Sequence, residues 1–107
     1  MAVRLDTIDV YRAGPLTVVG FGGRNALDVS VVACQNELTK VLRESNCHTL
    51  AVDLTGVRLV ASGMLGVFAS IQRRGVRVLL FNPSPDLIEV LEITKLDRLL
   101  PVHTVEA

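Results

Sequence analysis

Aromatic side chains are scarce in this chain of 107 residues, which has no tryptophan, one tyrosine and three phenylalanines. It also lacks an excess of either charge, because 11 lysines and arginines balance 11 aspartates and glutamates. Proteins that bind nucleic acid usually carry a basic patch, often with aromatic side chains on which bases stack. The composition therefore argues against direct nucleic-acid binding. Since half of the residues are hydrophobic, it also argues against disorder.

Long apolar runs are missing as well. The first 14 residues contain Arg4, Asp6 and Asp9 where a signal peptide needs an unbroken apolar core, and no stretch approaches the ~20 apolar residues of a membrane span. We therefore expect a cytosolic protein without membrane insertion. The length predicts a single domain over residues 1–107, which would bury about 60–65% of its unfolded surface.

Cysteine is rare, and no metal or cofactor site is predicted. Cys34 and Cys47 are the two cysteines, and in a reducing compartment free thiols are favoured over a bridge. Cys47, His48 and His103 have no second ligand pair at zinc spacing.

The glycines of Gly20-Phe21-Gly22-Gly23 lie between a predicted strand and a helix, but they do not form a nucleotide-binding motif. The dinucleotide motif G-x-G-x-x-G needs a glycine where Asn25 stands, and G-x-x-x-x-G-K-[ST] is absent. A flexible loop is the better interpretation. With no nucleophile paired to a base in the sequence pattern, we do not expect an enzyme.

Hydrophobic periodicity predicts strands that alternate with helices after an initial hairpin. The apolar residues of the first helix recur at three- and four-residue steps, and the glycine of Gln72-Arg73-Arg74-Gly75 ends the second. The last long strand, 76–81, is apolar except for Arg77, which predicts burial on both faces. The fold class is therefore α/β: a mixed sheet of four to five strands with an N-terminal hairpin and helices packed against it. The expected strands are 5–11, 16–21, 50–54, 76–81 and 102–105, and the expected helices are 30–44, 62–74 and 86–93, with a last helical turn in the segment 96–101.

The stretch from Ala51 to Phe68 is the centre of this pattern, with a buried strand, a turn at Thr55-Gly56 and Ser62 at the threshold of a helix. Ser62 is well placed to be an N-cap, whose oxygen accepts an otherwise unpaired amide hydrogen. Alternatively, its hydroxyl lies at a positive helix end where a phosphate would be tolerated. Met64 and Leu65 follow directly, and the pattern leaves open whether they lie in the core or form an exposed apolar contact.

The same stretch resembles the signature of STAS domains, best known as bacterial anti-sigma factor antagonists. Asp53-Leu54-Thr55-Gly56-Val57 followed by Leu59-Val60-Ala61-Ser62-Gly63-Met64-Leu65-Gly66-Val67 is similar to the family pattern D-L-S-G-V, two or three residues, then D-S-S-G-L-G-V. Leu27-Asp28 resembles the G-E-L-D loop of the family, and the segments 82–85 and 96–102 resemble its C-terminal third. The resemblance implies the STAS fold, with Ser62 as the phosphate acceptor.

Departures from the family pattern bear on this mechanism. Ala61 replaces the aspartate that normally precedes the acceptor, and Gly63-Met64 stands where the family has S-G. Asp28 is either a plain helix-start residue, favourable at the positive end of the dipole, or the counterpart of the family's loop acid, which lies close to the acceptor serine.

Two functions follow from the resemblance. The first is a cytosolic signalling adaptor that binds an anti-sigma factor, a serine kinase of the histidine-kinase-like ATPase type, and so frees a sigma factor, with Ser62 as the phosphorylation switch. The alternative is an interaction subunit without phosphorylation, either a constitutive antagonist or the small partner of a lipid-transport ATPase. The partner face would comprise Asp28, Ser62, Gly63, Met64 and Leu65.

Overall fold

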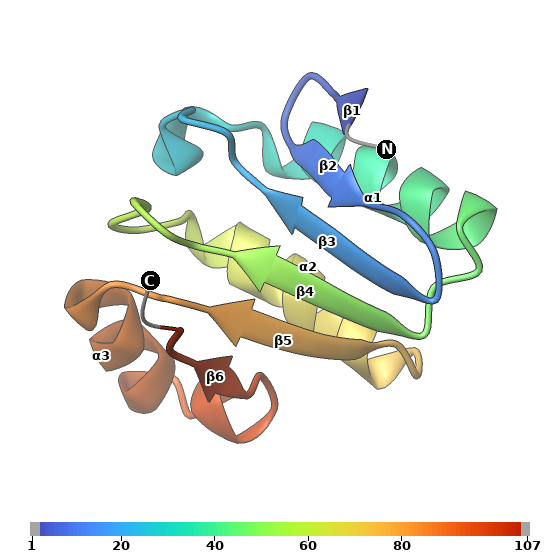
Figure 1. Cartoon of the computed structure of the whole chain (residues 1–107). Helices are drawn as coiled ribbons and strands as arrows, with labels where there is room; N and C mark the ends of the chain where they lie inside the picture. The colour runs from blue at the N-terminus through green and yellow to red at the C-terminus, as the bar shows by residue number, and fades with distance from the viewer. Residues whose placement is uncertain (1–2, 106–107) are drawn as a thin grey trace.

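A six-stranded mixed sheet is the frame of the structure, a computed structural model that describes residues 3–105 (Figure 1). The strands lie side by side in chain order, with β1 to β3 antiparallel and β3 to β6 parallel. Parallel neighbours need crossover connections, and helices supply them between β3, β4, β5 and β6. The strands are β1 (Val3–Arg4), β2 (Asp9–Arg12), β3 (Leu16–Gly20), β4 (Thr49–Asp53), β5 (Arg77–Phe81) and β6 (Val102–His103).

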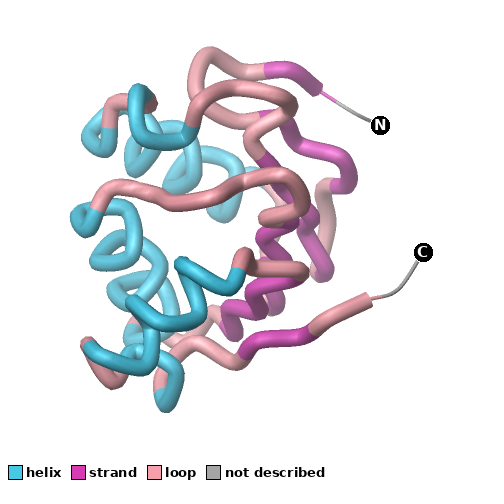
Figure 2. Tube along the Cα trace, turned by 90° about the vertical axis from the view of Figure 1, so that its left-hand side faces the viewer, coloured by secondary structure: helices cyan, strands magenta, loops and turns pink. Residues whose placement is uncertain are grey.

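All of the helices lie on one side of this sheet, as the edge-on view in Figure 2 shows. Because each crossover returns to a parallel neighbour, its helix packs back onto the sheet, and successive right-handed crossovers place their helices on the same side. This arrangement confirms the predicted α/β fold class. The α-helices are α1 (Val31–Glu44), α2 (Ser62–Arg73) and α3 (Pro85–Ile93), and short 3₁₀ turns occupy η1 (Ala26–Asp28) and η2 (Leu96–Arg98).

Helix α1 forms where its residue spacing predicts it. The Ser30 side chain accepts a hydrogen bond from the Ala33 amide (3.2 Å) and so caps the first turn. Cys34 and Leu38, one turn apart, are fully buried against the sheet. Together with Leu50 of β4 and Phe68 of α2 they belong to one continuous core between the sheet and the helices.

The N-terminal segment 5–11 is not the single strand that its alternating pattern predicts. The Leu5 amide donates to the Ile8 carbonyl (2.8 Å), which closes a turn between β1 and β2. Ile8 is buried, and the Glu37 carboxylate accepts hydrogen bonds from the amide and the hydroxyl of Thr7 (3.0 and 2.7 Å). Residues 5–8 therefore form a turn, and only residues 9–11 of the expected strand lie in β2. The turn brings Val3–Arg4 back as the edge strand β1, so the sheet has six strands where four to five were expected.

Strand β5 was expected to be buried on both faces, and this expectation is wrong. Val78 and Leu80 are buried toward the helices, but Leu79 and Phe81 are only half-buried. The apolar run 78–81 shows that both faces of the strand avoid water, but it does not say whether the chain itself covers each face. Here the helices cover one face of the sheet only.

Smaller differences concern the C-terminal third. Helix α3 begins at Pro85, one residue before the expected Asp86, because Ser84 caps it by accepting a hydrogen bond from the Leu87 amide (3.0 Å). The expected last helical turn is the 3₁₀ turn η2, and β6 is shorter than the predicted strand 102–105.

Candidate functional site

Ser62 follows a loop that leaves the carboxyl end of β4 and is closely tied down. The Asp53 carboxylate accepts hydrogen bonds from the amide and the hydroxyl of Thr55 (3.0 and 2.6 Å), and the side-chain amide of Asn82 donates to the same hydroxyl (3.0 Å). Gly56 has a φ of +79°, a conformation that favours glycine. These contacts hold the loop in one conformation, and this conformation sets the position of Ser62 at the start of α2.

The second half of this loop is held by α3. The Arg58 guanidinium forms an ion pair with Asp86 (2.8 Å), and the Ser84 hydroxyl donates to the Arg58 carbonyl. Val60 is buried immediately before α2 begins. The start of α2 is thus anchored from the sheet side and from α3.

Ser62 is not the N-cap of α2, which corrects the first of the two sequence interpretations. The N-cap position is occupied by Ala61, whose side chain cannot accept a hydrogen bond, and Ser62 is the first helical residue. Its side chain is exposed. The first amides of a helix have no hydrogen-bond partners within the helix. A phosphate attached to the Ser62 oxygen would therefore lie near unpaired N–H donors and the positive end of the helix dipole.

Met64 and Leu65 are core residues, so the exposed-contact alternative for them is wrong. Their side chains are 0% and 2% exposed, and both belong to the main hydrophobic core. Because α2 turns by about 100° per residue, a start with Ser62 facing water turns the next positions toward the sheet. Neither side chain is available to a partner in this structure.

Gly63 stays at the surface and lies against α1. A Cβ atom added to Gly63 would stand 3.3 Å from a methyl carbon of Val31, which is tighter than an ordinary contact. The lack of a side chain therefore lets the first turns of α1 and α2 approach one another. Asp28 ends the 3₁₀ turn just before α1 and is exposed. It is not the cap of α1, a role that Ser30 fills.

Sequence reasoning did not assign Leu27 and Val32 to the site. They lie on either side of Ser30 and are 53% and 68% exposed, although both are large apolar residues. One signal was present: the apolar residues Val31, Cys34 and Leu38 follow one another at three- and four-residue steps, and Val32 lies about 100° away from Val31 around the helix. We call the surface formed by Leu27, Asp28, Val32, Ser62 and Gly63 the Ser62 corner.

The glycine loop before η1 is more closely tied to the chain than its composition predicts. The Arg24 guanidinium donates to the Asp9 carboxylate (2.9 Å) and to the carbonyls of Phe21, Asp6 and Leu5. Gly22 has a φ of +59°, and a Cβ atom there would lie 2.0 Å from Asp9. The glycines thus serve the packing of this loop against β2, and Arg24 is already occupied by its protein partners.

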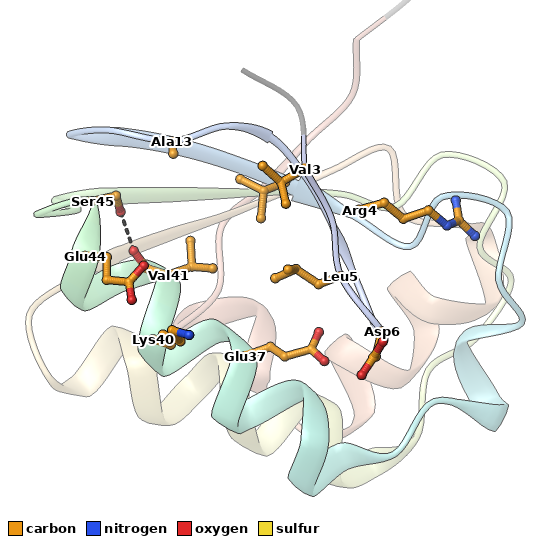
Figure 3. Close-up of a pocket in the computed structure, with 11 residues that line it drawn as sticks. Val3, Arg4, Leu5, Asp6, Ala13, Glu37, Lys40, Val41, Glu44 and Ser45 are labelled. Carbon is orange, nitrogen blue, oxygen red and sulfur yellow. Dashed lines mark hydrogen bonds between the residues drawn. The ribbon is translucent and has the colours of Figure 1, made fainter.

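A cavity of about 490 Å³ lies between the β1–β2 segment and α1 (Figure 3). None of the residues of the Ser62 corner lines it. Its wall is formed by apolar side chains and its rim by charged ones, and Figure 3 shows Leu5 and Val41 pointing toward its centre. It is lined by Val3, Arg4, Leu5, Asp6, Val10, Ala13, Glu37, Lys40, Val41, Glu44 and Ser45.

Both cysteines are free, as predicted, and their surroundings differ. Burial raises the pKa of the Cys34 thiol. A hydrogen bond with Thr7 lowers this pKa in part, and the neighbouring Glu37 carboxylate raises it further. Cys47 is half-buried.

We therefore expect iodoacetamide to label Cys47 at least ~10-fold faster than Cys34 in the native protein, because the reagent needs an accessible thiolate. Peptide mapping by mass spectrometry would measure both rates, with guanidinium-unfolded protein as the control; equal native rates would contradict the burial of Cys34.

Comparison with known proteins points to one family. The family model described as STAS domain matches residues 23–107. No curated protein matches the chain. The solved structure of the protein TM1081 has a TM-score of 0.74 at 16% identity, covering 90% of this chain and 79% of that one. An anti-sigma factor antagonist from Mycobacterium paratuberculosis has a TM-score of 0.71 at 21% identity, covering 91% and 84%.

Within residues 3–105, no helix combines the length and the apolar character that crossing a lipid bilayer requires.

Proposed function

Because the chain belongs to the STAS domain family, we propose that it is a cytoplasmic anti-sigma factor antagonist, which acts by binding an anti-sigma factor rather than by catalysis. The likeness to the antagonist from Mycobacterium paratuberculosis supports this assignment. The observation that carries it is the Ser62 corner: Ser62 is exposed at the start of α2, the next residue packs against Val31 at the start of α1, and Leu27 and Val32 are exposed around that start. An apolar contact surface next to a modifiable hydroxyl is what a reversible protein–protein contact requires.

The partner in this proposal is an anti-sigma factor with serine kinase activity, of the histidine-kinase-like ATPase type. Unphosphorylated, the Ser62 corner binds the anti-sigma factor and the sigma factor is released. Phosphorylation of Ser62 adds about −1.5 to −2 charges to this contact. The helix end tolerates that charge, while a docked partner would have to bury it, so the complex dissociates without a change of fold.

Leu27 and Val32 test the position of the contact. Each change to aspartate is expected to weaken binding to the kinase-type anti-sigma factor by about 10- to 100-fold, because a charge would replace an apolar side chain buried at the interface. Isothermal titration calorimetry with the purified proteins would measure the dissociation constants.

Ile93→Asp is the matched control for these variants. Ile93 is 72% exposed at the end of α3, so the same chemical change is made outside the Ser62 corner and should leave affinity unchanged. If Leu27→Asp and Val32→Asp bind as tightly as Ile93→Asp, the contact is elsewhere.

The alternative on the same fold is an interaction subunit that is not phosphorylated. Ala61 favours it, because the family has an aspartate before the acceptor and this chain has none. Such a protein would be a constitutive antagonist or the small partner of a lipid-transport ATPase. Capture of a transporter ATPase from the native cytosol, with no ~80 Da phosphate adduct on the recovered chain, would favour this alternative.

A further inference from the structure

The sheet face opposite the helices is uncovered in residues 3–105, as Figure 2 shows. Strand register identifies the residues that point to it. Where β3, β4 and β5 pair, Val18, Ala51 and Leu79 form one cross-strand row. The flanking rows consist of Leu16, Thr49 and Arg77 at the amino end and Arg4, Asp9, Gly20, Asp53, Phe81 and His103 at the carboxyl end. We call these three rows, with Tyr11 and Arg12 of β2, the open sheet face.

This face is apolar where water-facing strands are usually polar. Val18, Leu79 and Phe81 are half-buried, and Leu16 is exposed. The Tyr11 ring lies over Gly20, since a Cβ atom there would stand 2.6 Å from a ring carbon of Tyr11. Antiparallel sheets often leave one polar face in water, but parallel strands are normally covered on both faces. The parallel strands β3 to β6 therefore have the composition of a covered sheet and a cover on one side only.

Charges on the open sheet face are distributed unevenly along the strands. Arg77 lies in the row at the amino end of the parallel strands, and Arg12 pairs with Val18 in the next row. Asp53 lies in the row at the carboxyl end. Within residues 3–105 none of these three side chains forms an ion pair, although one carboxylate oxygen of Asp53 accepts hydrogen bonds from Thr55. Arg4 and Asp9, in the same row as Asp53, form an ion pair with each other (3.4 Å). The face thus offers cations toward one end, a carboxylate at the other, and apolar side chains between them.

We propose that a second copy of this chain covers the open sheet face, with the two sheets packed face to face and their strands running in opposite directions. That direction sets the amino end of one face, with Arg77, against the carboxyl end of the other, with Asp53, so the surface complements itself as a twofold interface requires. The Cα extents of 34 × 31 × 28 Å allow one face to supply the ~800 Å² that each partner contributes to a standard interface.

The proposed contact is separate from the Ser62 corner. Helix α2 lies on the other side of the sheet, so dimerisation leaves both copies of the corner free for the anti-sigma factor. Dimer formation and binding of the anti-sigma factor can therefore be tested separately. It also accounts for the apolar character of strand β5 on both of its faces.

Sedimentation velocity of the full chain, from about 1 to 500 μM, tests the proposal across the range of ordinary homodimer affinities. Wild type is expected to pass from monomer to dimer within this range. Leu79→Glu and Arg77→Glu should each weaken the dimer at least ~10-fold, because one places a charge in the apolar centre and the other sets like charges against each other. Arg77 is exposed, so Arg77→Glu keeps the test valid even if Leu79→Glu impairs folding.

Val32→Glu and Arg73→Glu are the matched controls, since both residues are exposed on helices at the other side of the sheet. They should dimerise as wild type does. A wild-type monomer at 500 μM would overturn the proposal and leave the face for a different polypeptide. The proposal would also be overturned if neither Arg77→Glu nor a folded Leu79→Glu weakened the dimer. It would equally be overturned if both control variants weakened the dimer as much as these two variants do.

Discussion

Replacing Met64 with aspartate is expected to unfold the domain. Met64 is 0% exposed and lies in the main core. Truncating a buried methionine costs about 2–5 kcal/mol, and an unpaired carboxylate placed in the same apolar space adds several more. A typical domain has a free energy of unfolding of roughly 5–15 kcal/mol. We therefore expect a loss of at least ~4 kcal/mol, measured as the shift in urea-induced unfolding followed by circular dichroism.

Gly66→Asp is the control for this prediction. Gly66 lies on the same helix, is exposed, and would place an added Cβ atom in open space. The same aspartate there should leave the free energy of unfolding within about 1 kcal/mol of wild type. If Met64→Asp unfolds at the same urea concentration as Gly66→Asp, Met64 is not a core residue. The sequence alone makes Met64→Asp look like a test of partner binding, and the burial of Met64 removes that use.

Introducing a negative charge at Ser62 is expected to abolish partner binding while leaving the fold intact. Ser62→Glu should weaken binding to the kinase-type anti-sigma factor by at least ~100-fold, because the partner would have to desolvate an unpaired carboxylate. The stability of the free protein should stay the same or rise by about 0.3–1 kcal/mol, since Ser62 is exposed at the positive end of α2. Calorimetric titration and thermal unfolding would measure the two effects separately.

Ser62→Ala distinguishes charge from the loss of the hydroxyl. It should bind as wild type does and, on incubation with the anti-sigma factor and Mg-ATP, should fail to gain the ~80 Da adduct that intact-mass analysis would find on wild type. If Ser62→Glu binds with wild-type affinity and wild type gains no adduct, the switch does not exist in this protein and the constitutive alternative stands. A Ser62→Glu variant with lowered stability would instead contradict the exposed placement of the side chain.

Local pattern was sufficient for the elements that depend on local interactions. The spacing of apolar residues predicts α1, and Gly75, with a φ of +100°, ends the second helix where expected. The order of strands and helices predicts a mixed sheet, because parallel neighbours require crossovers. The exposed positions of Ser62, Gly63 and Asp28 are consistent with the site proposed from the family pattern, whose function stays a prediction.

The expectations that were wrong depend on contacts between distant parts of the chain. Whether Met64 faces the core depends on where α2 begins relative to the sheet, and the loop anchored by Asp53 and Asn82 decides that. Val31 lies against Gly63 at the start of α2, and its neighbour Val32 is left exposed.

The sequence by itself therefore determined the elements, their order and the family, because caps, turns and hydrophobic periods act over a few residues. Only the tertiary structure decided which apolar residues are covered. Val78 and Leu79 are similar neighbours in one apolar run, yet Val78 is buried against the helices while Leu79 faces away from them. The hydrophobic effect favours covering both, and the placement of the helices on one side of the sheet sets which of them this chain covers by itself.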